Sequence, residues 1–152
     1  MGTTDCIERS VLLKAPRARV WQALENAGEF GHWFGVDFQG ARFVAGSHAR
    51  GKVTQPGWDH LWMDVWIERV EPQRLLSWRW HPGAIDATAD LPQAETTLVV
   101  FRLQDAPGGT LLTVVESGFD RVPPARRLAV FRENTEGWDA QMRNIAQHVA
   151  AS

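Results

Sequence analysis

The sequence is poor in the residues and segments on which several classes of function depend. It contains one cysteine, Cys6, among 152 residues, which excludes an internal disulfide and any zinc or iron–sulfur site built from cysteines of this chain alone. Sixteen Lys and Arg against 18 Asp and Glu leave a net charge of −2, so no basic excess indicates nucleic acid or an anionic membrane surface as a partner. No run approaches the roughly 18 apolar residues of a membrane span, and no signal segment opens the chain. We expect a soluble, cytoplasmic protein.

Motifs for catalysis and for cofactors are also missing. The chain has no Walker loop, no G-x-S-x-G elbow and no G-x-G-x-x-G after a strand. None of its five histidines forms an H-E-x-x-H pattern or shares helical i,i+4 spacing with another. We therefore expect no metal ion and no cofactor, and whether the protein is an enzyme stays open.

Tryptophan is abundant instead: the chain has eight tryptophans and no tyrosine. Trp58, Trp62 and Trp66 recur with strand-like alternation, and Trp78 and Trp80 do so again. Each ring combines one N–H donor with a large apolar body that buries roughly 150–250 Å². Such rings form either a tryptophan-rich core or the walls of a cavity that holds a flat or greasy ligand.

The chain opens with a predicted strand and two short helices. Residues 5–14 carry apolar residues on strand-like parity. Pro16 suits a first helical turn, and Val20, Trp21 and Leu24 follow at helical spacing. A second helical piece is predicted over residues 29–34.

The middle of the chain, up to Phe119, is predicted to consist mainly of strands. The clearest strands are predicted over 58–70, 75–81, 96–104 and 110–117. The last two form a hairpin around Pro107-Gly108-Gly109. Residues 81–94 show little periodicity, and loops of that length are often lids at a binding mouth.

A long helix is predicted after Pro123-Pro124. Its apolar stripe consists of Leu128, Phe131, Trp138, Met142, Ile145 and Val149. Such a helix must lie across the sheet. Gly137, which costs about 1 kcal/mol relative to alanine inside a helix, indicates either close approach of another backbone or a bend beside a cavity. No linker or repeat interrupts the chain, so we expect a single domain over residues 1–152.

Several segments carry a resemblance to a known family. LLKAPRARVWQAL (12–24) and EFGHWFG (29–35) resemble the opening of the SRPBCC, or START-like, superfamily, whose members share the helix-grip fold of the birch-pollen allergen. Residues 70–82, 110–120 and 133–145 look like the strands and closing helix of one bacterial branch. That branch is similar to the C-terminal domain of the activator of the 90-kDa heat-shock-protein ATPase.

The resemblance implies an α+β helix-grip fold. A curved antiparallel β-sheet would wrap around the long C-terminal helix, with two short helices after the first strand and an apolar cavity between sheet and helix. Members of the superfamily bind lipids, hormones or polyketides, and a few cyclise or dehydrate polyketides.

Two predicted strands carry polar residues that could take part in binding or catalysis. Glu116 shares a strand face with Leu112 and Val114 by alternation, so it is either a polar group beside apolar cavity walls or an interior glutamate paired with an arginine. On strand 75–81, either Trp78 and Trp80 or the pair Arg79 and His81 faces inward. We expect the tryptophans inward, because two exposed indoles would be costly.

The run 58–67 looks buried on both faces. Trp58, His60, Trp62, Asp64 and Trp66 share one parity, with His60 and Asp64 as candidate polar anchors or rim groups. A second copy of the chain is one candidate for the partner that covers this strand.

Three functions remain as hypotheses. The first is binding of a small hydrophobic or aromatic molecule, with Glu116 as polar anchor. The walls of that site would be Trp78, Trp80, Val99, Phe101, Leu112, Val114, Trp138 and Met142. The second is a polyketide cyclase or dehydratase that uses Glu116 as acid or base together with His81 or Arg79. The third is a protein-interaction module with a chaperone as partner, which only the family resemblance implies.

Overall fold

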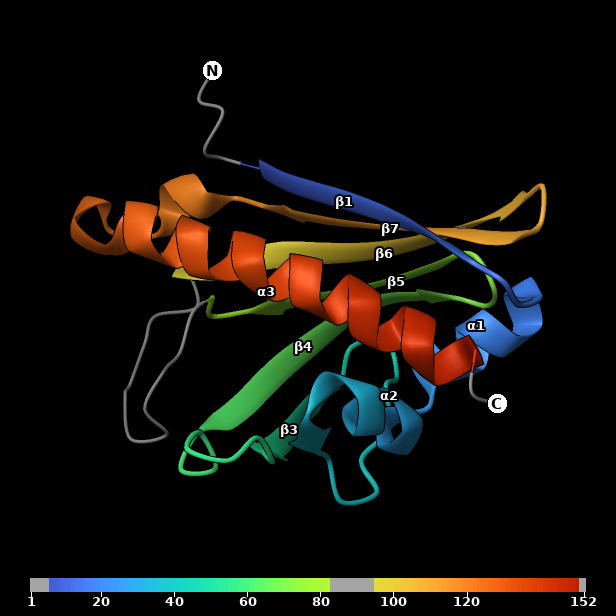
Figure 1. Cartoon of the computed structure of the whole chain (residues 1–152). Coiled ribbons are helices and arrows are strands. Elements are labelled where there is room, and N and C mark those ends of the chain that lie inside the picture. Colours follow the sequence, from blue (N-terminus) through green and yellow to red (C-terminus); the bar gives the residue numbers. More distant parts are fainter. Residues whose placement is uncertain (1–5, 83–94, 151–152) are drawn as a thin grey trace.

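The structure is a computed structural model that describes residues 6–82 and 95–150 (Figure 1). From residue 83 onward, the loop predicted over 81–94 lies outside the described residues. The strands are β1 (Cys6–Leu13), β2 (Val36–Asp37), β3 (His48–Val53), β4 (Trp62–Glu71), β5 (Leu75–Trp80), β6 (Thr97–Ala106) and β7 (Gly109–Ser117). The helices are α1 (Arg17–Glu25), α2 (Ala27–Phe34), the 3₁₀ turn η2 (Phe119–Arg121) and α3 (Pro124–Ala150).

All seven strands form one antiparallel sheet in the order β1-β7-β6-β5-β4-β3-β2. Helix α3 crosses one face of this curved sheet, which we call the inner face (Figure 1). Arg9 of β1 donates from Nε to Oδ1 of Asp139 at 2.7 Å and ties the sheet edge to the helix. The predicted α+β helix-grip fold is confirmed.

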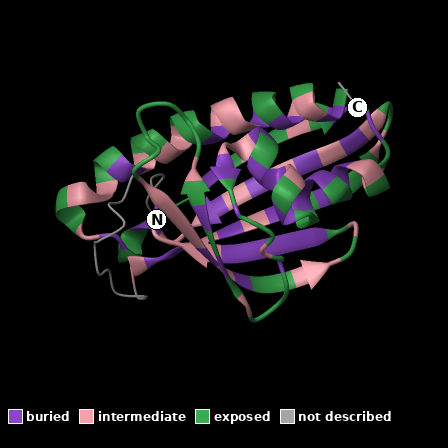
Figure 2. Ribbon diagram, turned by 90° about the horizontal axis from the view of Figure 1, so that it is seen from below, coloured by how far each residue is buried: buried purple, intermediate pink, exposed green. Residues whose placement is uncertain are grey.

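Strand register decides which residues face α3. Ile7 pairs with Glu116, Glu116 with Val99, and Val99 with Trp78. Residues directly opposite one another in a sheet share a face, so these residues form one row across the inner face. Figure 2 shows buried residues along the strands and exposed residues along the outer sides of the helices.

Helices α1 and α2 lie beside α3 (Figure 1), and the caps of α2 and the side chain of Trp33 fix the position of α2. The side chain of Asn26 accepts from the backbone N–H of Glu29 at 2.9 Å and begins α2. Trp33 donates from its indole to the carbonyl of Ala23 at 2.8 Å and holds α2 against α1. Gly35, at φ +93°, ends α2 in the left-handed conformation that glycine adopts readily.

Two expectations from the sequence need correction. The predicted strand over 58–70 begins only at Trp62, because Pro56 and Gly57 initiate a turn in which the backbone of Trp58 donates to Gln55 at 2.9 Å. Trp58 is therefore 48% exposed and does not belong to the strand face of Trp62 and Trp66. Leu128, expected in the apolar stripe of α3, is 51% exposed.

The structure tests one of the two expectations for Gly137. Among the described residues, no heavy atom lies within 4 Å of where its Cβ would stand. The expectation of close backbone approach is wrong. No described helix combines the length and apolar character needed to cross a membrane.

Candidate functional site

Glu116 forms the polar centre of the inner face. It lies on β7, is fully buried, and accepts hydrogen bonds from four side chains on three other elements. The indoles of Trp80 and Trp138 each donate at 2.8 Å, and the Thr97 hydroxyl donates at 2.6 Å. The amide of Asn134 donates to Oε1 at 2.9 Å and to Oε2 at 3.0 Å. The carboxylate thus joins β5, β6 and β7 to α3.

Every partner of this carboxylate is electrically neutral. In the described residues Glu116 forms no ion pair with Lys, Arg or His, so the expected alternative of an arginine partner is wrong. A carboxylate is an acceptor with about four lone-pair sites, and the four donors match that capacity. Full satisfaction is what allows a group of this polarity to be buried.

Two of these donors, Asn134 and Thr97, were not predicted from the sequence. Asn134 precedes Trp138 by four positions and therefore lies on the same helix face, which is a signal that could have been used. Thr97 pairs directly with Trp80 across β5 and β6, and that register cannot be read from one strand alone.

The residues predicted as cavity walls lie together on the inner face and on α3. Eight of the nine predicted ligand-binding residues are at most 5% exposed, and Trp80 is half-buried. Trp80 stacks on Trp138 at 5.8 Å between ring centroids, and Phe101 meets Trp138 edge-on at 5.7 Å and Trp78 at 5.2 Å. The rings pack against one another, and their contact with a ligand stays a prediction.

Trp78 differs from its neighbours in its hydrogen bonding. Its indole nitrogen is buried and has no acceptor among the described residues. Buried donors without a partner are rare and cost free energy. The inner face therefore contains one unused donor close to the rings that surround Glu116.

A groove of about 880 Å³ opens on the other side of Asn134. It is bounded by the C-terminal end of α2 over residues 32–35, by the turn that carries Gln55 and Trp58, and by the face of α3 over residues 133–144. Trp33, Phe34 and Trp58 give it aromatic walls. Because Asn134 both lines the groove and donates to Glu116, it connects the groove with the buried carboxylate.

Gly137 keeps this groove open. It lies on the groove wall midway along α3, and open space lies where a side chain would stand. A larger residue here would project into the groove, whereas the neighbouring Trp138 is buried, donates to Glu116 and does not line the groove. Gly137 thus lies beside a concave surface, and the expected bend of the helix at this position stays a prediction.

Polar contacts hold α2 against α3 along the groove. Gln141 donates from Nε2 to the carbonyl of Phe34 at 3.0 Å. Further along, Glu29 contacts His148 at 2.7 Å and Arg19 at 2.5 Å. Burial raises the pKa of the Glu29 carboxyl, but the hydrogen bonds and positive charges of His148 and Arg19 outweigh burial, so that its pKa lies below the ordinary value.

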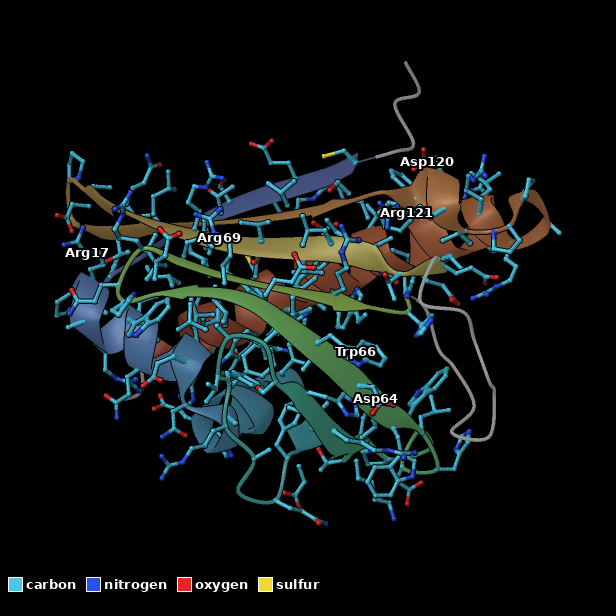
Figure 3. The ribbon with its side chains drawn as sticks, turned by 180° about the vertical axis from the view of Figure 1, so that it is seen from behind. Arg17, Asp64, Trp66, Arg69, Asp120 and Arg121 are labelled. Carbon is cyan, nitrogen blue, oxygen red and sulfur yellow. The ribbon has the colours of Figure 1, made fainter. Side chains whose placement is uncertain are left out.

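Asp64, the other predicted polar anchor, and Trp66 lie on the opposite, outer face of the sheet. Figure 3, viewed from behind, shows Asp64 and Trp66 on the side turned away from α3. Asp64 contacts His48 at 2.8 Å, and the His48 ring stacks on Trp66 at 5.0 Å. His60 is exposed in the turn before β4.

The structure confirms that Trp78 and Trp80 face inward. Arg79 pairs with Glu68 at 3.0 Å on the outer face, and His81 meets the Trp66 ring at 5.6 Å. Arg79 and His81 are thus separated by the sheet from Glu116. In the part of the chain that the structure describes, no three His, Cys, Asp or Glu side chains are grouped closely enough to hold a metal ion.

Fold and sequence together define the class of this protein as a START-like, helix-grip protein of the SRPBCC superfamily. Residues 14–150 match the family described as "Activator of Hsp90 ATPase homolog 1-like protein". The chain belongs to this family. A search among curated proteins gives no match.

Solved structures share the fold at low sequence identity. The chain is similar to a protein from Arthrobacter aurescens with a TM-score of 0.80 and 16% identity, covering 98% of this chain and 88% of that one. The Aha1 dimer from Colwellia psychrerythraea matches with a TM-score of 0.71 and 17% identity over 95% of both chains. DynU16, from the dynemicin biosynthetic locus, matches with a TM-score of 0.73 and 23% identity over 96% of this chain and 47% of DynU16. This chain thus spans about half the length of DynU16.

Proposed function

We propose that the protein binds a small aromatic or hydrophobic molecule in the groove between α2 and α3. The observation that carries this proposal is the position of Asn134, which lines a groove of about 880 Å³ and donates to the buried Glu116. Ligand pockets typically have roughly 300–1,000 Å³, apolar and aromatic walls and a few fixed polar groups. The groove has a volume in this range and three aromatic side chains in its walls, and Asn134 is a fixed polar group within it.

Asn134 is the group that would orient the ligand. Its amide nitrogen is held by Glu116 at 2.9 and 3.0 Å, so the side chain is fixed in direction before a ligand arrives. Preorganised polar groups lower the ordering cost of binding. The stacked rings of Trp80 and Trp138, predicted from the sequence as walls of a cavity between sheet and helix, also donate to Glu116 but are not among the residues that line the groove.

A cyclase or dehydratase remains the second candidate, because Glu116 is a buried carboxylate between sheet and helix. A general acid or base must reach the proton that it transfers. All four partners of Glu116 already donate to it, and a substrate would have to displace one of them. We therefore favour binding over catalysis.

Filling the groove tests the proposal. Gly137→Leu places a side chain in the open space on the groove wall, and Ala129→Leu adds the same side chain at an exposed position elsewhere on α3. Isothermal titration with a panel of flat aromatic compounds should give saturable binding to the wild type. We expect Gly137→Leu to lose at least about tenfold in affinity, equivalent to roughly 1.4 kcal/mol, and Ala129→Leu to bind as the wild type does. Equal affinities for both variants would show that binding occurs elsewhere.

A further inference from the structure

The groove has an uneven charge. Glu133 and Glu136 line it, and none of the described residues that line it is Lys or Arg. In the described residues neither glutamate forms an ion pair. Even Arg132, one turn before Glu136, does not pair with it. Both carboxylates are therefore available to a charged ligand.

Helix α2 adds to this negative potential. Its C-terminal residues Phe34 and Gly35 form part of the groove wall. The C-terminal end of a helix carries a partial negative charge and favours cations. Gln141 donates to the Phe34 carbonyl at 3.0 Å and the backbone N–H of Thr54 donates to the Gly35 carbonyl at 2.9 Å. These donors are neutral, so they satisfy the carbonyls without adding a positive charge.

Glu116 is a third source of negative charge, and it lies behind the groove. Its partners are all neutral donors, which satisfy its oxygens and leave its charge without a counter-ion among the described residues. A charge in a buried environment is screened less than one in water. Asn134, between the groove and Glu116, is itself uncharged and does not reverse the field.

The aromatic walls suit the same kind of ligand. Trp58 is 48% exposed, and together with Trp33 and Phe34 it gives the groove three aromatic side chains. The face of an indole attracts a cation that lies within about 6 Å of the ring. In the described part of the chain, His32 is the single basic side chain that lines the groove, and its ring is tilted against that of His148 at 5.6 Å between centroids.

We propose that the ligand of this groove is cationic: an amine or quaternary ammonium group attached to an aromatic or apolar body. The positive group lies near Glu133 and Glu136, and the apolar body lies against Trp33, Phe34 and Trp58. This inference rests on the proposed binding function, and it adds the charge of the ligand.

Three probes that share a naphthalene ring and differ in charge test whether the groove prefers a cationic ligand. Isothermal titration at low ionic strength compares 1-naphthylmethylamine, 1-naphthylmethanol and 1-naphthoate on the wild-type protein, on the double variant Glu133→Gln/Glu136→Gln and on the control Glu8→Gln. Glu8 is exposed on β1, on the outer side of the sheet. We expect the amine to bind the wild type about 5- to 20-fold more tightly than the alcohol, the size of effect of two partly exposed charge pairs, and naphthoate to bind most weakly.

The variants distinguish the contribution of the two glutamate charges to affinity from that of the apolar groove walls. The double variant should lose most of the preference for the amine and keep its affinity for the alcohol within about twofold, while Glu8→Gln keeps both affinities. Equal affinities of the wild type for amine and alcohol would overturn the proposal of a cationic ligand, and so would a preference for the amine that survives in the double variant. Either result would leave the proposed binding function intact. Failure of all three probes to bind would count against both proposals. Circular dichroism of the double variant shows whether its fold is kept.

Discussion

Replacing Glu116 with glutamine should lower the free energy of unfolding by about 2–4 kcal/mol. The change exchanges one carboxylate oxygen for an amide NH₂ group, which donates where the oxygen accepted. Oε1 accepts from Trp138 and Asn134, and Oε2 accepts from Trp80, Thr97 and Asn134. Whichever way the amide turns, its NH₂ group faces an indole N–H.

The size of this loss in stability depends on which of the four donors can rotate to accept a hydrogen bond instead. The Thr97 hydroxyl and the Asn134 amide can rotate to present an acceptor, whereas an indole N–H can only donate. One indole, of Trp80 or Trp138, is therefore left without an acceptor at a cost of about 1–3 kcal/mol. The remaining bonds lose the assistance of the carboxylate charge, which accounts for roughly 1 kcal/mol more.

Urea unfolding followed by far-ultraviolet circular dichroism measures this effect without relying on tryptophan emission. Glu8→Gln removes the same charge at an exposed position and should stay within about 0.5 kcal/mol of the wild type. In a double-mutant cycle, Glu116→Gln and Trp138→Phe should be non-additive by about 0.5–3 kcal/mol, since they remove parts of one network. A Glu116→Gln protein with the same midpoint and slope as Glu8→Gln would refute the structural role of the carboxylate.

Three further predictions concern the helices. Gly137→Ala should raise the free energy of unfolding by about 0.5–1 kcal/mol, because the helix gains propensity and the Cβ meets no neighbour; a lower melting temperature would contradict this. Gly31→Ala should destabilise by at least about 1–3 kcal/mol, because its Cβ would stand 1.9 Å from the carbonyl oxygen of Val36, and an unchanged urea midpoint would be inconsistent with that contact. Glu29 has a lowered pKa, so its contribution to stability is present above its ordinary pKa of 4.5 and is lost as the pH falls through the lowered value. Glu29→Gln should accordingly be destabilised at pH 7 and lose less stability than the wild type on acidification; parallel pH profiles would argue against the ion pairs.

Much of the fold could be predicted because it depends on short-range patterns. Alternation placed Glu116 on the same face as Leu112 and Val114, and all three are fully buried. The periodicity after Pro123 predicted α3, and the Pro107-Gly108-Gly109 turn predicted the hairpin of β6 and β7. These features need only the geometry of one element or of two adjacent ones.

The candidate site could be predicted only in part because it depends on distant elements. Trp80 and Thr97 meet Glu116 through the register of three strands, and Asn134 reaches it from α3. Trp58 was assigned to a strand by its alternation with Trp62, although the preceding Pro56 and Gly57 turn the chain. The groove itself arises from the placement of α2 beside α3, for which one sequence contains no direct signal.

The most direct test of the proposed binding site uses the indole signals of the eight tryptophans in a ¹H–¹⁵N correlation spectrum, assigned by single Trp→Phe variants. Trp33 and Trp58 line the groove, whereas Trp66 lies on the outer face of the sheet beside His48. On titration with 1-naphthylmethylamine, we expect the signals of Trp33 and Trp58 to shift with one saturating curve and that of Trp66 to stay in place. A saturating shift of Trp66 with Trp33 and Trp58 unchanged would move the binding site to the outer face and contradict the proposal.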